Sequence, residues 1–269
     1  MENNSLEKPL ILEERPPKTT PVNAALTFAW RALLRIRYIP EQLFDVTAFP
    51  IIFLLMFTYL FGGAISGSTG EYLNFVLPGI LVMTVSMITM YTGLDLNKDI
   101  EKGVFDRFRS LPIWQPAVLV GALLVDVVRY SLASTIMITL GYILGFRAEA
   151  GFIGVILAVL VILFFSFSLS WVWTILGIIV RSEKALMAIS MMLLFPLTFL
   201  SSVFVDPSTM PNWLQRFVEI NPITFVVDAS RGLIHGYDVT SELLTITYIS
   251  LGLIAVFGTL TMYFFRNKE

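Results

Sequence analysis

Long apolar runs alternate with short polar connections along this chain, and the alternation predicts its elements. Six segments are strongly apolar and carry few charges, at about 43–63, 73–93, 118–145, 152–180, 185–204 and 242–265. A helix rises about 1.5 Å per residue, so each segment is long enough to cross a hydrocarbon core about 30 Å thick. The sequence therefore predicts an all-α integral membrane protein in which residues 23–269 form a single domain of six transmembrane helices.

The region before the first span divides into two parts. Residues 1–22 are rich in proline and mixed charge, which is typical of a disordered tail. Residues 23–39 predict a basic amphipathic helix, with Arg31 and Arg35 on one side and Trp30 and Leu33 on the other. This helix is too short and too basic to span, so we expect it to lie in the membrane interface. The alternative is a helix packed on a partner protein.

The longest charged insert lies between the second and third spans, from Asp95 to Ile113. Ile100, Val104 and Phe108 recur at helical spacing on one face, and Pro112 ends the pattern. We expect a short amphipathic helix over about 99–111. It either rests on the bilayer surface or inserts into a partner.

Two short helices are predicted between the fifth and sixth spans, over about 206–235. Trp213 and Phe217 share one face of the first helix, and Asn221-Pro222 breaks the chain after it. The second carries Asp228 and Arg231 at i and i+3. Neither is long or apolar enough to span, so we expect them to dip into the outer leaflet or to cap the bundle.

The distribution of basic residues predicts the orientation. With the N-terminus in the cytoplasm, 14 of the 18 Lys and Arg residues fall inside, and Arg147, Arg216 and Arg231 fall outside. Arg129 lies within a span. Because cytoplasmic loops are enriched in Lys and Arg, we expect a multi-pass protein of the cell membrane with both termini in the cytoplasm.

Composition excludes several classes of function. Of the 269 residues 14% are charged, against about 25% in soluble domains, and the net charge of -2 gives no basic field for nucleic acid. The chain has no cysteine and one histidine, His235, so we expect no metal site. It has no phosphate-binding GxxxxGK[ST] motif and no Ser/His/Asp set, so we expect no catalytic residues. Energy for transport would come from an ion or from another subunit.

Asp126 and Arg129 are the ionisable residues deepest in a predicted span. At i and i+3 they can neutralise each other. They mark either a polar point in a pathway or subunit contact, or a self-satisfied pair near the inner interface. An ion-coupled carrier that needs no ATPase would use this pair.

The order of these features resembles that of type 2 ABC exporter permeases, in the daunorubicin-resistance-like branch, from about Asn23 to Arg266. The resemblance rests on the interfacial helix before span one and on YLNFVLPGILVMT with its Pro78-Gly79 step. It rests further on DIEKGVFDRFRSLPI and on the run that closes on N-P and D-x-x-R. The matching residues are Glu101, Gly103, Phe108, Pro112, Asn221, Pro222, Asp228 and Arg231, whereas Val104 stands where threonine is common.

The resemblance implies a transporter of two permease subunits, as a homodimer or a related heterodimer, with two ABC ATP-binding subunits on the cytoplasmic face. The helix at about 99–111 would be the coupling helix, seated in the ATPase through Phe105 and Phe108. Arg107 and Arg109 would meet carboxylates around it, and the Arg181–Lys184 loop would be a second contact. The outer helices would gate the exit. ATP and magnesium would be held by the partner, with no cofactor on this chain.

We therefore expect a permease subunit, not an enzyme, that exports a hydrophobic or amphipathic drug, antibiotic or lipid by alternating access. One alternative is export of a lipid-linked polysaccharide or teichoic-acid-type polymer, which aromatic residues of the fourth span facing a central path would favour. Others are the ion-coupled carrier and a membrane sensor or scaffold that does not transport.

Overall fold

A computed structural model describes residues 20–38, 40–103 and 116–267, and within these ranges the chain is helical with no strand. Five helical stretches are long and apolar enough to cross a membrane: Ala48–Ser66, Thr69–Glu101, Ala117–Leu144, Gly151–Ile179 and Thr240–Phe265. The predicted all-α membrane class is thus confirmed.

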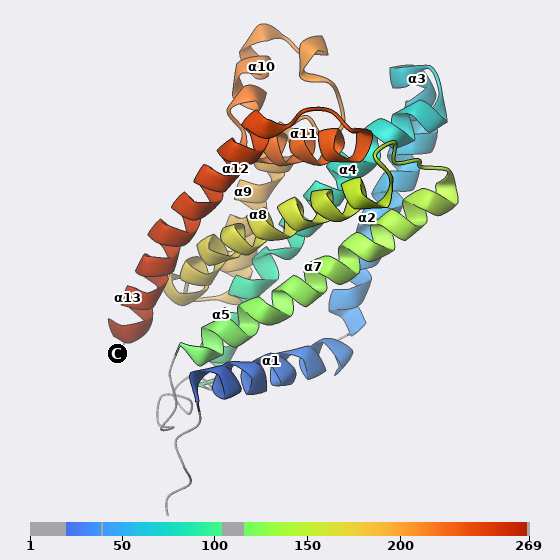
Figure 1. Cartoon of the computed structure of the whole chain (residues 1–269). Coiled ribbons are helices and arrows are strands. Elements are labelled where there is room, and N and C mark those ends of the chain that lie inside the picture. The colour runs from blue at the N-terminus through green and yellow to red at the C-terminus, as the bar shows by residue number, and fades with distance from the viewer. Residues whose placement is uncertain (1–19, 39, 104–115, 268–269) are drawn as a thin grey trace, which may run out of the picture.

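The helices follow one another with short connections (Figure 1). They are α1 (Pro21–Tyr38), α2 (Pro40–Met56), η1 (Phe57–Phe61), α3 (Gly62–Ser66), α4 (Thr69–Ile88), α5 (Met90–Glu101), α7 (Ala117–Leu144), α8 (Gly151–Ile179), α9 (Glu183–Phe199), η2 (Pro207–Thr209), α10 (Asn212–Glu219), α11 (Pro222–His235), α12 (Thr240–Leu253), η3 (Ile254–Gly258) and α13 (Thr259–Asn267). Single π-helical turns, η1 and η3, join α2 to α3 and α12 to α13.

The observed boundaries agree with two predicted spans and differ for two others. The third and fourth spans begin and end within one residue of the prediction. The second continues through α5 to Glu101, beyond its expected end at 93, because the insert keeps helical spacing. The fifth segment forms α9, whose 17 residues end at Phe199, and its crossing of the membrane stays a prediction.

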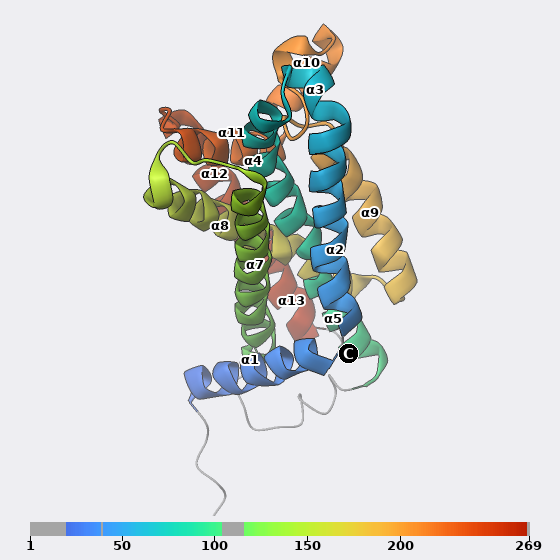
Figure 2. The same cartoon turned by 90° about the vertical axis from the view of Figure 1, so that its right-hand side faces the viewer.

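The long rod of α4 and α5 is the centre of the bundle. Within its apolar window 83% of the residues are buried, against 22% for the α2–α3 stretch and 11% for α12–α13. Five helices contact this rod: α2, α7, α8, α9 and α11 (Figures 1 and 2). The α4–α5 rod is therefore the element through which the surrounding helices meet.

Helix α1 lies across one end of the bundle and packs against α7 (Figure 2). Ala24 and Ala25 are buried against Ala117 at the start of α7. Leu26 and Trp30 remain exposed, with 63% of Trp30 accessible. An apolar face turned away from the protein fits a helix that lies on the membrane interface. The end of α13 lies at this same end of the bundle, and α3 and α10 lie at the opposite end.

The two predicted outer helices have different surroundings. Helix α10 stands exposed at the end of the bundle, with 74% of Trp213 accessible and only Val218 fully buried. Helix α11 packs among α4, α8 and α12, and most of its residues are buried. Of the pair, α11 is therefore an internal part of the bundle and α10 is a cap.

Candidate functional site

A proline within α4 is compensated by side chains of α11. Pro78 lacks an N–H, so the carbonyl of Asn74 loses its helical partner. The Nε2 atom of His235 lies 3.3 Å from that carbonyl oxygen. The next carbonyl, of Phe75, accepts hydrogen bonds from Nε and Nη2 of Arg231 at 3.2 and 3.1 Å. The last turns of α11 thus provide polar contacts to the carbonyls in the turn of α4 before Pro78.

Arg231 also holds the segment that follows α9. Its Nη2 donates to the carbonyl of Ser202 at 3.0 Å, and its Nη1 lies 3.3 Å from a carboxylate oxygen of Asp228. The Ser202 hydroxyl donates to the same oxygen of Asp228 at 2.8 Å. The guanidinium stacks on the Phe75 ring, 3.9 Å from its centroid. One side chain therefore joins α11, α4 and the α9–α10 connection.

Asn221 caps two helices at once. Its Nδ2 donates to the carbonyls of Leu197 and Leu200, at 2.8 and 2.7 Å, which are free at the C-terminal end of α9. Its Oδ1 accepts from the amide of Ile223 at 2.9 Å, and Pro222 occupies the first helical position of α11. Asn221 therefore fixes the angle at which the chain leaves α9 and enters α11.

The connection after α9 is held from α4 as well. The Tyr72 hydroxyl donates to the carbonyl of Phe204 at 3.0 Å. Further along, hydrogen bonds from the hydroxyl and the amide of Ser208 lower the pKa of the Asp206 carboxyl. We call the polar contacts made by Asn221, Asp228, Arg231 and His235 the outer cluster. The sequence indicated the first three of these residues, but it did not indicate that Arg231 and His235 contact the carbonyls of Phe75 and Asn74 in the turn before Pro78.

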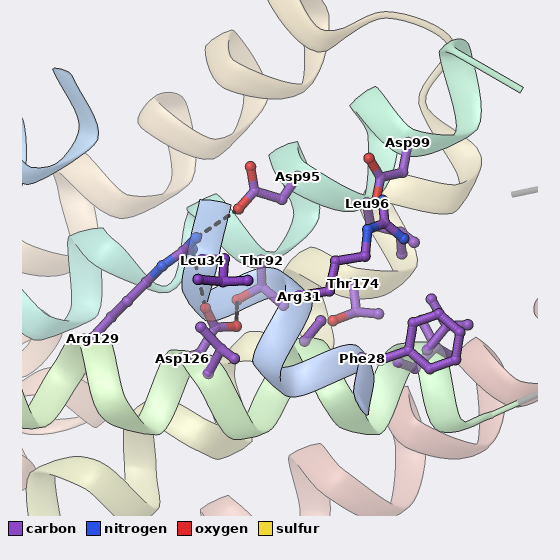
Figure 3. Close-up of a pocket in the computed structure, with 14 residues that line it drawn as sticks. Phe28, Arg31, Leu34, Thr92, Asp95, Leu96, Asp99, Asp126, Arg129 and Thr174 are labelled. Carbon is purple, nitrogen blue, oxygen red and sulfur yellow. Dashed lines mark hydrogen bonds and ion pairs between the residues drawn. The ribbon is translucent and has the colours of Figure 1, made fainter. Parts of the chain in front are cut away.

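The predicted pair of Asp126 and Arg129 belongs to a larger network (Figure 3). Asp126 accepts from the Thr92 hydroxyl at 2.5 Å and from Arg129 at 3.2 Å. Arg129 also reaches Asp95 on α5, at 2.9 Å. The side chains of Asp126 and Arg129 are only 4% and 10% exposed. Arg129 is thus shared by two carboxylates and connects α7 to α5. The sequence-based alternative of a pair that only neutralises itself did not include this link.

This network borders a cavity of about 340 Å³ between α1, α5 and α7. Arg31 of α1 lies 3.7 Å from Asp99 of α5 at its rim, and Figure 3 shows both groups beside the cavity. The remaining walls are largely apolar, from Phe28, Leu34, Leu96, Val118, Leu119, Ala122 and Val125. No group of three or more His, Cys, Asp or Glu side chains that could hold a metal ion occurs in the described part of the chain.

A second cavity, of about 220 Å³, lies between α2, α4, α5 and α9. Its lining is mostly methionine and aromatic: Met83, Met87, Met90, Met187, Met191, Phe49, Tyr91 and Phe195. Thioether side chains are flexible and polarisable, so such a lining adapts to apolar and aromatic molecules. The sequence did not indicate this cavity, because its methionines come from separate helices.

The expected ATPase contacts are described only in part. Glu101 is the last residue of α5 and is exposed, so the start of the expected helix at 99 lies within α5. Gly103 follows with φ of 64°, in the left-handed region that favours glycine. Arg181 and Lys184 are exposed around the start of α9. The expected contacts Phe105, Arg107, Phe108 and Arg109 lie outside the described residues.

The outer cluster and the Asp126–Arg129 network both lie within the part of the chain that matches a known protein family. Residues 23–235 match a family model described as ABC-2 type transporter. The daunorubicin resistance ABC transporter permease protein DrrB1 of Streptomyces coeruleorubidus is 50% identical over 256 residues, which cover 95% of this chain and 90% of that protein. The probable doxorubicin resistance ABC transporter permease protein DrrC of Mycobacterium tuberculosis is 21% identical over 77% of this chain and 75% of its own length. The inner membrane transport permease YadH of Escherichia coli is 22% identical over 68% and 72%.

Proposed function

The chain belongs to the ABC-2 type transporter family, as a permease subunit embedded in the membrane, and we propose that it exports an apolar, aromatic drug-like molecule. Separate ABC ATP-binding subunits supply the energy and hold ATP and magnesium, and this chain carries no cofactor. Resistance to daunorubicin and to doxorubicin, in the names of two relatives, supports this class of cargo.

The methionine-lined cavity is the observation that carries the choice of cargo. Its walls offer apolar and aromatic surface with almost no polar group to fix a sugar or an ion. Its volume of about 220 Å³ is below the roughly 300 Å³ at which ligand pockets begin. We therefore propose that a second permease subunit, identical or related, completes the site.

The proposed arrangement has six spans with both termini in the cytoplasm of a cell-membrane protein. Helix α9 serves as the fifth span, because its 17 residues extend about 26 Å and a short span is accommodated by local thinning of the bilayer. Glu101, Gly103 and the segment that follows, with Arg181 and Lys184, face two copies of the ATP-binding subunit. The outer cluster shapes the exit.

Two of the fourth-span aromatic residues, Phe165 and Trp173, give no support to the polymer-exporting alternative. Phe165 and Trp173 are buried in the bundle, and Trp173 donates from its ring nitrogen to the Thr89 hydroxyl at 2.7 Å. Neither lines the two cavities described above. Both side chains belong to the packing of α8 against the rest of the bundle.

The decisive experiment is transport of daunorubicin into inside-out vesicles that contain the purified permease with its co-purifying ATP-binding subunit. We expect uptake that requires ATP. Met87→Ala should raise the half-saturating drug concentration about fivefold, for a lost contact of about 1 kcal/mol, with little change in basal ATP hydrolysis. Met87→Leu keeps the volume and should behave like the unaltered protein. Uptake that ignores ATP and collapses with an ionophore would instead establish the ion-coupled carrier.

A further inference from the structure

The inner end of α5 carries four polar side chains that reach four different helices. Asp95 contacts Arg129 of α7 at 2.9 Å, and Asp99 lies 3.7 Å from Arg31 of α1. Between them on the chain, Asn97 and Lys98 point instead toward α8 and α9. We call Asp95, Asn97, Lys98 and Asp99 the α5 hub.

The two central hub residues contact the α8–α9 corner. Asn97 donates from Nδ2 to the carbonyls of Gly177 and Val180, at 3.0 and 2.7 Å, at the end of α8. The Nζ atom of Lys98 lies 2.6 Å from the Glu183 carboxylate in the first turn of α9. The four hub residues, which lie within five consecutive positions of α5, thereby join this helix to α1, α7, α8 and α9.

The contact between α5 and α8 is the rigid one of the set. A Cβ atom at Gly93 would collide with the backbone of Trp173, and one at Gly177 would collide with the backbone of Gly93. Two helices whose backbones touch in this way must move together. The Lys98–Glu183 and Arg31–Asp99 ion pairs are by contrast partly exposed. They can hold two helices together during a movement, and they can also break and re-form.

Asn97 links α5 to the end of α8 with one of its two polar atoms left over. Its Oδ1 atom is buried and accepts no hydrogen bond from the residues that the structure describes. A buried acceptor without a partner is energetically costly. An alanine would avoid that cost but would leave the Gly177 and Val180 carbonyls at the end of α8 without this donor, so Asn97 both caps α8 and links it to α5.

We propose that the α5 hub distributes movement of the segment after Gly103 to α1, α7, α8 and α9. The left-handed turn at Gly103 separates the stiff helix from that segment, and α5 continues into α4, whose outer end meets the outer cluster. A displacement at Glu101 is thereby carried both sideways and along the rod. This inference rests on the proposed function, because the force originates in the ATP-binding subunits.

The ion pair of Lys98 with Glu183 allows a direct test by charge exchange. In the vesicle assay, Lys98→Glu and Glu183→Lys should each lower the amount of drug moved per ATP about five- to tenfold, while ATP hydrolysis persists. The double exchange should recover most of the loss. Glu71→Lys, at the exposed outer end of the same rod, is the matched control and should have no effect. Equal loss of hydrolysis and transport, or no recovery in the double exchange, would overturn the hub.

A second measurement separates the hub from the identity of the cargo. The chain has no cysteine, so spin labels can be placed at Thr27→Cys on α1 and Ala188→Cys on α9. We expect ATP to change the distance between the labels in the otherwise unaltered complex, not in Lys98→Glu, and again in the double exchange. The same change in all three would refute the hub, whatever drug is moved. If no ATP-binding subunit binds the chain, the proposed function fails and the hub fails with it.

Discussion

Arg231 shows how much one side chain can hold in this bundle. It donates to two backbone carbonyls, pairs with Asp228 and stacks on the Phe75 ring. Only a planar guanidinium can make these contacts together, because an ammonium has neither the fork of donors nor the flat face. The residue therefore combines charge and shape.

Arg231→Lys should lower the free energy of unfolding by about 2–3 kcal/mol, because the Phe75 carbonyl and Asp228 lose well-placed donors in a half-buried site. The midpoint of thermal unfolding in mild detergent measures this loss. Arg216→Lys on the exposed helix α10 is the control and should change the midpoint little. Equal effects at both positions would contradict the assigned network.

Pro78 and His235 should be coupled energetically. His235→Ala should destabilise the protein by about 1 kcal/mol, because the carbonyl of Asn74 then lacks a partner. In the background of Pro78→Ala, a backbone N–H is restored and the same change should cost much less. A double-mutant cycle of unfolding midpoints gives the interaction energy, and strictly additive losses would show that the two residues act independently.

At the scale of elements, close backbone contact decides which helices move together. Gly93 and Gly177 bring α5 and α8 into contact, and the Thr89–Trp173 and Asn97–Gly177 hydrogen bonds lie on either side. Helix α12 lacks such a contact at Gly252, where nothing lies within 4 Å of an added Cβ. The same residue type therefore has opposite roles in the two helices.

Gly177→Ala should destabilise the bundle, since the new methyl group has to push α5 away from α8. We expect a loss of about 2 kcal/mol in the free energy of unfolding. Gly252→Ala, in open space, should be neutral or stabilising by up to about 1 kcal/mol, because alanine favours the helix. Thermal unfolding of both variants in the same detergent gives the comparison, and a loss at Gly252 would argue against open space there.

At the scale of the whole molecule, the two ends of the bundle differ in chemistry. The end with α1 gathers the α5 hub and the basic loop before α9, and the other end carries α10 and the outer cluster. The chain-wide bias of Lys and Arg predicts that the first end faces the cytoplasm.

This orientation predicts which cysteines can be labelled from outside. In intact cells, a membrane-impermeant maleimide should react with Ser208→Cys at the exposed turn before α10. Lys102→Cys, just past α5, should react only after the cells are made permeable. The absence of native cysteine makes either variant a clean probe. The reverse pattern of labelling would invert the proposed topology.

Local pattern was enough for some of these features. Runs of apolar residues predicted the third and fourth spans closely, because a helix that satisfies its own backbone is the stable form of such a run in lipid. The Asn221-Pro222 break and the i, i+3 spacing of Asp228 and Arg231 are also local, so the sequence indicated them.

Only the tertiary structure decided which distant groups meet. Arg231 and the Phe75 carbonyl lie 156 positions apart, and Asp95 joins Asp126 and Arg129 from another helix. The methionine cavity likewise forms from separate helices, and α11 is buried only because α4, α8 and α12 surround it. Sequence periodicity determines which face of a helix is apolar, but the partner of that face depends on how the helices pack, which no local pattern contains.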